Sequence, residues 1–296
     1  MVGDAMCCAR VRLGAAEMLF VAEKYLEGFR LGVRALSGNV LEVRADRCDG
    51  IALEFWRVIV AAYEAPQRHY HTLQHVHSLL VEIDQTESIS KDDKALLSLI
   101  AFFHDVVYDP TRNDNEAKSA EVFDECLRRC TVFLGKATCE NAANGMDTVR
   151  RGILATKDHF SCPADTPEVI KYFLDMDVAI LGASAATYCQ YADQVRLEYS
   201  HVVDSAFAEG RITFLEKCLS QENIYKTEHF RALYEQSARD NIEHEINNLQ
   251  LLQRHREDEA MNQLIKATQL QLLDFEAVRQ ILFTPPPLLP SVKYPF

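Results

Sequence analysis

Apolar residues recur at steps of three and four along nearly every long segment of the chain. The pattern is clear in AEMLFVAEKYLEGFRLGVRAL (16–36) and in IALEFWRVIVAAYEA (51–65), which stops at Pro66. Such a period places the apolar side chains on one face of a helix. It predicts further helices at 70–83, 91–108, 115–130, 146–156, 166–182, 184–207, 210–220, 227–253 and 256–282. Strand-like alternation of useful length is absent from the sequence, so we expect an all-α fold.

Polar segments rich in turn-forming residues separate the predicted helices. YDPTRNDN (108–115) and KATCENAANG (136–145) combine Asp, Asn, Pro or Gly in the way that is typical of loops. The tail FTPPPLLPSVKYPF (283–296) cannot continue a helix beyond its start, because proline lacks the backbone donor. The expected organisation is an N-terminal helical extension (1–49), a helical domain (50–253), and a C-terminal helix with a proline-rich tail (254–296).

Composition and charge narrow the classes of partner. The chain has 296 residues and a net charge of −13, which argues against binding to a nucleic acid polymer, since that requires a cationic surface. No apolar segment reaches the ~18–20 residues that a membrane span requires. The nine cysteines are scattered without a CxxC pair, which is typical of reduced thiols. We therefore expect a cytoplasmic protein that has no membrane or nucleic-acid partner, and we leave a homo-oligomer open.

Histidines gather in RHYHTLQHVH (68–77), which holds four of the ten in the chain. His71 and His75 are four residues apart and share one face of a helix. Farther along, His104 and Asp105 end the apolar run LLSLIAFF, where burying an imidazole and a carboxylate is costly unless something satisfies them. A metal ion would do so. The alternatives are exposed histidines in the first segment and a His–Asp pair bonded to backbone in the second.

Two carboxylates, Asp175 and Asp177, interrupt the apolar segment YFLDMDVAILG (172–182). Residues two apart on a helix cannot face the core in the same way. One of them can therefore bind a metal while the other caps a helix or supports a ligand. The alternative is that both are solvated.

Several segments together resemble one family. RHYHTLQHV, AFFHDVVYDPTRNDNEAKSA, ILATKDH, FLDMDVAILG, YADQVRLEYSHV and NIYKTEHFRALYEQSARDNIEHEI are similar to the HD superfamily of metal-dependent phosphohydrolases, in its branch of predicted phosphohydrolases. The resemblance covers roughly residues 50–250 and implies an HD-type helical bundle in that range. The N-terminal segment, the insert near 136–145 and the proline-rich tail have no counterpart in that pattern.

The resemblance also implies a site. It assigns a divalent ion (Mn, Mg, Co, Ni, Zn or Fe) to His75, His104, Asp105 and Asp177, with Asp175 supporting a ligand. Catalytic roles fall to His71 as a proton donor, to Glu116 as the residue that orients water, and to Lys157. The alternative role for His71 is that of a metal ligand. Substrate-binding roles fall to Arg68, Lys157, His159 and Arg239.

Three of these residues also have a purely structural interpretation. Glu116 also suits the first turn of a helix, where the dipole favours a carboxylate. Lys157 is equally consistent with a solvated side chain, and Arg239 with an i, i+4 pair to Glu235.

The implied activity is hydrolysis of a phosphate ester or anhydride by metal-activated water. The expected substrate is a nucleotide or a related small phosphorylated metabolite. One alternative is a metal- or nucleotide-binding module without catalysis. Another is an HD-type di-iron oxygenase, which needs further histidines between the His-Asp pair and the last Asp. The sequence has one histidine between Asp105 and Asp177, His159.

Overall fold

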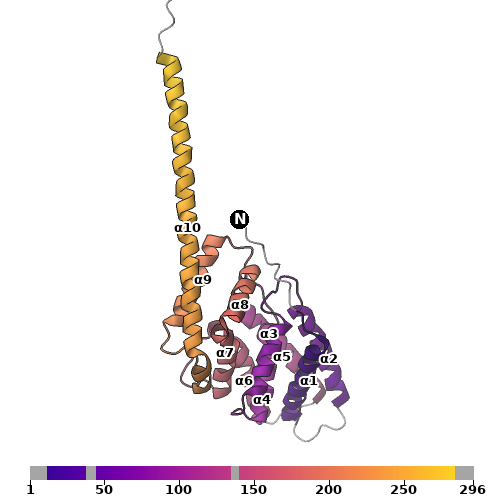
Figure 1. Cartoon of the computed structure of the whole chain (residues 1–296). Helices are drawn as coiled ribbons and strands as arrows, with labels where there is room; N and C mark the ends of the chain where they lie inside the picture. Colours follow the sequence, from indigo (N-terminus) through magenta and orange to yellow (C-terminus); the bar gives the residue numbers. More distant parts are fainter. Residues whose placement is uncertain (1–11, 38–44, 135–139, 284–296) are drawn as a thin grey trace, which may run out of the picture. The chain divides into compact units, whose positions relative to one another are not determined.

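Helices are the regular elements throughout the part of the chain that the computed structural model describes, residues 12–37, 45–134 and 140–283 (Figure 1). The α-helices are α1 (Ala15–Ser37), α2 (Ala45–Tyr63), α3 (Leu73–Gln85), α4 (Lys91–Phe103), α5 (Asn115–Leu134), α6 (Glu140–Ala155), α7 (Glu168–Asp177), α8 (Ala185–Glu198), α9 (Asp204–Leu219) and α10 (Glu228–Phe283). Two 3-10 turns, η2 (Thr156–Asp158) and η3 (Ala179–Gly182), follow α6 and α7. The expected all-α fold is confirmed.

The chain divides into two compact units, Met1–Glu245 and Ile246–Phe296. This division differs from the expected boundaries at 49/50 and 253/254. Helix α1 packs against α4 and α6 within the first unit, and its Val21, Tyr25 and Phe29 are buried. These residues are four apart and form one helical face, so α1 is part of the bundle rather than an extension of it.

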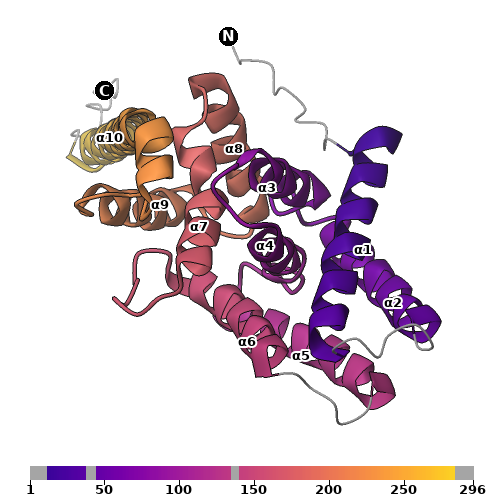
Figure 2. The ribbon, with the colours of Figure 1, turned by 90° about the horizontal axis from the view of Figure 1, so that it is seen from below.

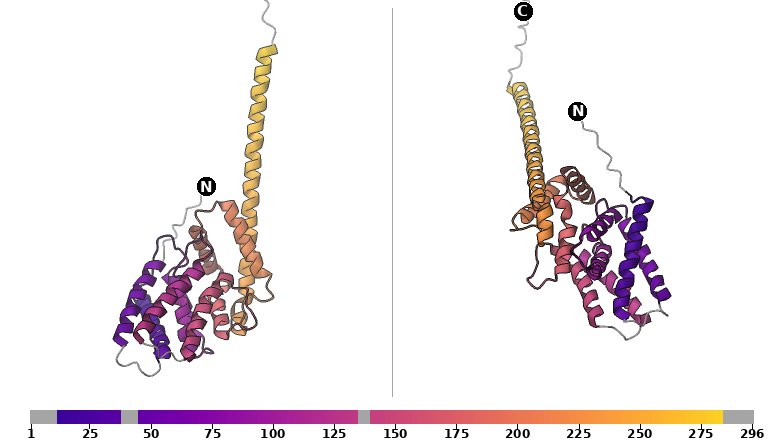
Figure 3. Two further views of the ribbon diagram at one scale, coloured as in Figure 1. Left: turned by 180° about the vertical axis from the view of Figure 1, so that it is seen from behind. Right: turned by 60° about the horizontal axis from the view of Figure 1, so that its bottom comes forward.

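Helix α4 forms the centre of the first unit. It contacts α1, α3, α5, α6 and α7. Figure 2 shows α4 surrounded by these neighbours, with the α1–α2 pair to one side, and Figure 3 gives two further views. Its apolar run Leu97–Phe103 is buried, as the sequence pattern indicates. A Cβ at Gly152 of α6 would lie 2.5 Å from Cδ1 of Ile100, so a larger residue at this position would require the Ile100 side chain to shift.

Helix boundaries differ from the sequence prediction at several places. The predicted helix 184–207 ends at Glu198, and α9 begins at Asp204. The guanidinium of Arg196 donates to the carbonyls of Tyr199 and Val202, which satisfies backbone groups that a continuous helix would have paired internally. The predicted helices 227–253 and 256–282 are one helix, since no glycine or proline separates them.

No helix among the described residues is long and apolar enough to cross a membrane. Residues 136–139 of the predicted loop and 284–296 of the predicted tail lie outside the described ranges. Residues 140–145, which were also predicted as loop, form the start of α6.

Candidate metal centre

Three helix ends bring polar side chains together in the core of the first unit. Thr72 caps α3 by accepting a hydrogen bond from the Gln74 N–H, which places His75 in the first turn of that helix. His104 follows the last residue of α4, and Asp177 is the last residue of α7. The sequence segments are far apart, but α3, α4 and α7 pack against one another.

The donor atoms of these residues converge on one point. His75 Nε2 lies 3.0 Å from Asp177 Oδ1 and 3.3 Å from His104 Nε2. His104 Nε2 is 3.5 Å from Asp177 Oδ1, and all three atoms lie within 4.8 Å of one another. Two imidazole nitrogens and a carboxylate oxygen are ligands that suit a divalent transition metal. The donor set fits such an ion.

Neighbouring groups fix the orientation of two of the three donors. His104 donates from Nδ1 to the Ala101 carbonyl at 2.9 Å, which directs Nε2 to the cluster. His159 Nε2 lies 2.7 Å from Asp177 Oδ2 and holds that carboxylate with Oδ1 turned inward. Hydrogen bonds to the outer atoms of metal ligands serve this purpose in metal sites. His159 therefore acts on Asp177, a contact that the sequence did not indicate.

Asp105 lies beside the three-donor cluster rather than within it. Its Oδ2 is 3.2 Å from His104 Nε2 and 3.9 Å from His71 Nε2. The three atoms that lie within 4.8 Å of one another belong to His75, His104 and Asp177. The structure thus brings three of the four expected ligands together and places the fourth in contact with one of them.

Burial and the close charges shift the pKa values of the cluster in opposite directions. Burial lowers the pKa of His75. Burial alone would lower the pKa of His104 too, but Asp105, Tyr63 and Asp177 together outweigh it and raise that pKa well above its ordinary value. The pKa of Asp177 lies well below its ordinary value, because the imidazoles of His104, His159 and His75 together outweigh the effect of burial. Its carboxylate is therefore ionised and available as a donor.

A buried carboxylate holds His71 beside the cluster. Glu198, the last residue of α8, accepts a hydrogen bond from His71 Nδ1 at 2.6 Å and from the Tyr108 hydroxyl at 2.9 Å through Oε2. Its Oε1 accepts from the backbone N–H groups of His69, Tyr70 and His71. Burial would raise the pKa of Glu198, but the His71 imidazole and these donors outweigh it and hold the pKa at about 2.

Glu198 is the main site residue that sequence reasoning missed. The sequence assigned no role to Glu198, although its segment YADQVRLEYSHV is one of those that carry the family resemblance. Its signal was present, because Tyr191, Val195 and Glu198 are spaced four and three apart and form the buried face of α8. A carboxylate on an apolar helix face is rarely left unpaired, so this position could have been singled out.

Arg68 and Arg239, expected to bind substrate, have structural contacts instead. The guanidinium of Arg68 is buried and donates to the carbonyls of His71, Asp105 and Val106. It therefore joins the two histidine-bearing segments and ends the helix that was predicted to continue to 108. Arg239 pairs with Glu235 and donates to carbonyls of the 219–222 turn, which agrees with the structural alternative.

Glu116 and Lys157, expected in catalysis, do not touch the donor cluster. Glu116 lies half-buried in the first turn of α5 and has no side-chain hydrogen bond or ion pair within the described part of the chain. Lys157 lies in η2, where its ammonium donates to the Asn113 carbonyl at 2.8 Å. This bond links η2 to the loop that precedes α5.

Asp175 caps a helix, which is one of the two roles expected for the aspartate that does not bind the metal. Its Oδ1 and Oδ2 each accept a backbone hydrogen bond of 2.7 Å, from Lys226 and Thr227, directly before α10 begins. The side chain is fully buried, and burial raises its pKa. Asp175 thus anchors the start of α10, and Asp177 is the carboxylate that joins the cluster.

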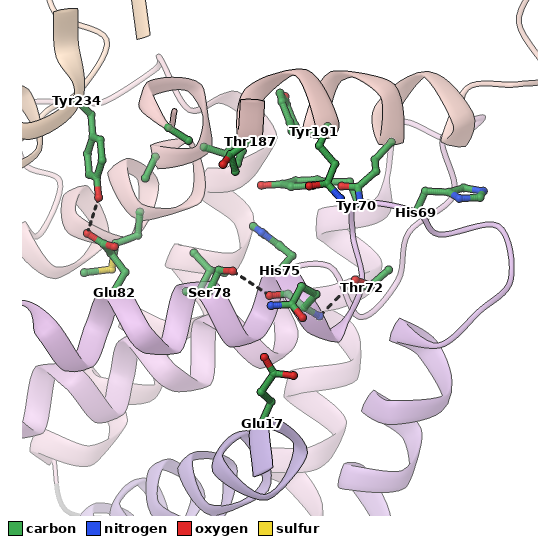
Figure 4. Close-up of a pocket in the computed structure, with 18 residues that line it drawn as sticks. Glu17, His69, Tyr70, Thr72, His75, Ser78, Glu82, Thr187, Tyr191 and Tyr234 are labelled. Atoms are coloured by element: carbon green, nitrogen blue, oxygen red, sulfur yellow. Dashed lines mark hydrogen bonds between the residues drawn. The ribbon is translucent and has the colours of Figure 1, made fainter. Parts of the chain in front are cut away.

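A cavity of about 610 Å³ borders His75 (Figure 4). Its wall comes from α1, the segment before α3, α3, α7, η3, α8 and α10. Figure 4 shows Tyr70 and Tyr191 beside His75, with Glu82 bonded to Tyr234. Two carboxylates, Glu17 and Glu82, line it, and the described lining residues include no Lys or Arg. The negative wall makes this a poor entrance for an anion.

We compared the chain with protein-family models, with curated proteins and with solved structures. No family model matches it, and neither a curated protein nor a solved structure matches it. The geometry of the site is therefore the basis for a functional proposal.

Proposed function

We propose that the chain is a metal-dependent phosphohydrolase that acts on a small phosphate ester or anhydride. The observation that carries the proposal is the convergence of His75 Nε2, His104 Nε2 and Asp177 Oδ1 within 4.8 Å in the core. Without a cation, burying this set would be costly. The resemblance of the motif-bearing segments to HD-superfamily phosphohydrolases supports the same chemistry.

A divalent ion held by these three residues would lower the pKa of a water molecule and neutralise charge that develops on a phosphate oxygen. Asp105, in contact with His104, is placed to accept a proton from that water or to complete the ligand set. His159 holds Asp177 in the required orientation.

His71 supplies the proton-donating group in this proposal. Its Nδ1 is bonded to Glu198, so Nε2 is the free ring atom, and it faces Asp105 at 3.9 Å. A proton on Nε2 can pass to a departing oxygen at the cluster. Glu198 is a positioning residue, because it touches the ring of His71 and the backbone around it rather than the donor atoms.

The test is phosphate release from a panel of nucleoside phosphates and sugar phosphates. The full chain is stripped with a chelator and then supplied separately with Mn, Mg, Co, Ni, Zn or Fe. We expect turnover of at least one compound that appears on metal addition and is lost in Asp177→Asn. Glu168→Gln, an exposed carboxylate on the same helix, is the matched control and should keep it.

Three outcomes would overturn the proposal. Metal binding without phosphate release across the panel would favour the non-catalytic binding module. Bound iron with an optical absorption band would favour the di-iron oxygenase. Turnover that survives in Asp177→Asn would place the active site elsewhere.

A further inference from the structure

A second cavity, of about 500 Å³, borders the site at His71. Its size lies within the range of roughly 300–1,000 Å³ that is usual for small-molecule pockets. Five aromatic rings line it, Tyr108, Tyr191, Tyr199, Phe207 and Phe214. A wall this rich in rings suits a flat apolar group, which gains by stacking and by leaving water.

Charged neighbours hold several of these rings in place. Tyr108 stacks on His71 with 4.2 Å between ring centroids, and its hydroxyl donates to Glu198. The Arg211 guanidinium lies over the rings of Tyr191 and Phe214, at 5.1 and 5.4 Å from their centroids. A wall whose rings are already fixed loses little entropy when a ligand binds.

The electrostatics of the two cavities differ. Among the described residues, the wall of this second cavity contains no Asp or Glu, whereas Glu17 and Glu82 line the first. Arg211 is already paired with Glu245, at 2.9 Å, so the wall is close to neutral rather than strongly positive. In a chain of net charge −13, the cavity without carboxylates is the better approach for an anionic ligand.

A helical glycine faces the same space. Gly210 of α9 lines the second cavity, and a Cβ built on it would meet no atom within 4 Å. Glycine inside a helix is unfavourable relative to alanine, so the protein's own packing does not explain it. Close approach of a ligand to the backbone is one of the settings in which glycine is used.

We propose that this cavity binds the aromatic base of a nucleotide whose phosphate lies at the donor cluster. The position of the phosphate rests on the proposed function, and the binding of the base rests on the aromatic wall and Gly210. His71 connects the two parts, since its ring stacks on Tyr108 in the cavity wall and its Nε2 faces Asp105. The substrate class is therefore a nucleotide rather than a sugar phosphate.

The test measures nucleoside binding in the absence of metal and turnover. Adenosine, guanosine, cytidine, uridine and, as a probe without a base, ribose are titrated into the full chain in chelator by isothermal calorimetry. We expect at least one nucleoside to bind and ribose not to. In Gly210→Leu the new side chain fills the cavity, and the dissociation constant should rise by roughly tenfold or more, as for the loss of a base–aromatic stack.

Gly50→Leu is the matched control. Gly50 lies in α2, it too has no atom within 4 Å of a built Cβ, and it lines neither of the two cavities. Nucleoside affinity should be unchanged in this variant, and both variants should retain the helix content of the wild type by circular dichroism. Binding of no nucleoside, or equal affinity in Gly210→Leu and the wild type, would overturn the proposal.

The two proposals fail in different ways. Nucleoside binding that is lost in Gly210→Leu, in a protein that releases no phosphate with any metal, would keep the base subsite and reject the hydrolase. Phosphate release from sugar phosphates, in a protein that binds no nucleoside, would keep the hydrolase and reject the subsite.

Discussion

Replacement of Glu198 by glutamine should destabilise the first unit by about 3 kcal/mol at neutral pH. The structure lowers the pKa of Glu198 from 4.5 to about 2. A shift of about 2.5 pKa units corresponds to ~3 kcal/mol at ~1.4 kcal/mol per unit. The raised pKa of His71 reflects the same contact and adds nothing to the sum. Glutamine keeps one acceptor oxygen but turns an N–H₂ group toward Tyr108 and His71.

The pH dependence has a defined sign. Because the pKa is lower in the folded state, the stabilising effect is fully present above pH 4.5, where both states are ionised. It decreases as the pH falls from 4.5 toward 2, since the unfolded state takes up the proton first. His71, whose raised pKa comes from the same contact, is charged more completely at pH 5 than at pH 7. The difference between wild type and Glu198→Gln should therefore be largest near pH 5 and smaller, by about 1 kcal/mol, near pH 3.5.

Urea unfolding followed by circular dichroism measures this difference at each pH. Glu121→Gln, which removes an exposed carboxylate paired with Lys118, is the control and should cost less than about 0.5 kcal/mol. A loss below about 1 kcal/mol at pH 5 in Glu198→Gln, or a loss that is equal at pH 5 and pH 3.5, would refute the reasoning.

Three further variants or conditions give separate expectations. Metal affinity should fall by about tenfold per pH unit below the raised pKa of His104, because a histidine binds a metal only through its deprotonated, neutral imidazole; calorimetry across a pH series measures it. Asp175→Asn loses one of two buried acceptors at the start of α10, so urea unfolding should show a loss of ~1–3 kcal/mol while the bound metal, measured by elemental analysis, is unchanged. Arg68→Met leaves three backbone carbonyls without their donor, and we expect a loss of about 3 kcal/mol or more in the same urea assay. Equal metal affinity at all pH values would contradict the role of His104 as a ligand. Loss of metal in Asp175→Asn would contradict its role as a helix cap, and wild-type stability in Arg68→Met would contradict the role of its three hydrogen bonds.

Part of the site could be predicted from sequence because its residues violate a local pattern. His104 and Asp177 are polar residues in apolar helical segments, and such violations are concentrated at functional positions. The choice of Asp177 over Asp175 agrees with the structure, but periodicity alone left it open. The choice depends on the position of residues 226–227, whose backbone N–H groups donate hydrogen bonds to the Asp175 carboxylate and so keep it out of the cluster.

Other features depend on tertiary contacts that carry no local signal. The partners of Arg68 are backbone carbonyls, which any residue provides, so its structural role could not be read from the residue types around it. The apolar face of α1 predicted a helix correctly but did not say which surface it covers, and α1 therefore looked like an extension. Helix α10 was divided in the prediction because its apolar period weakens near residues 253–256, although nothing there breaks the backbone.

Direct measurement of metal binding tests the central claim most closely. Mn²⁺ is titrated by calorimetry into the chelator-stripped wild type, Asp177→Asn and the control Glu168→Gln. The convergence of His75, His104 and Asp177 predicts about one ion per chain in the wild type and control, and an affinity at least ~100-fold lower in Asp177→Asn. Binding of Mn²⁺ to Asp177→Asn with the stoichiometry and affinity of the wild type would contradict the assignment of this cluster as a metal centre.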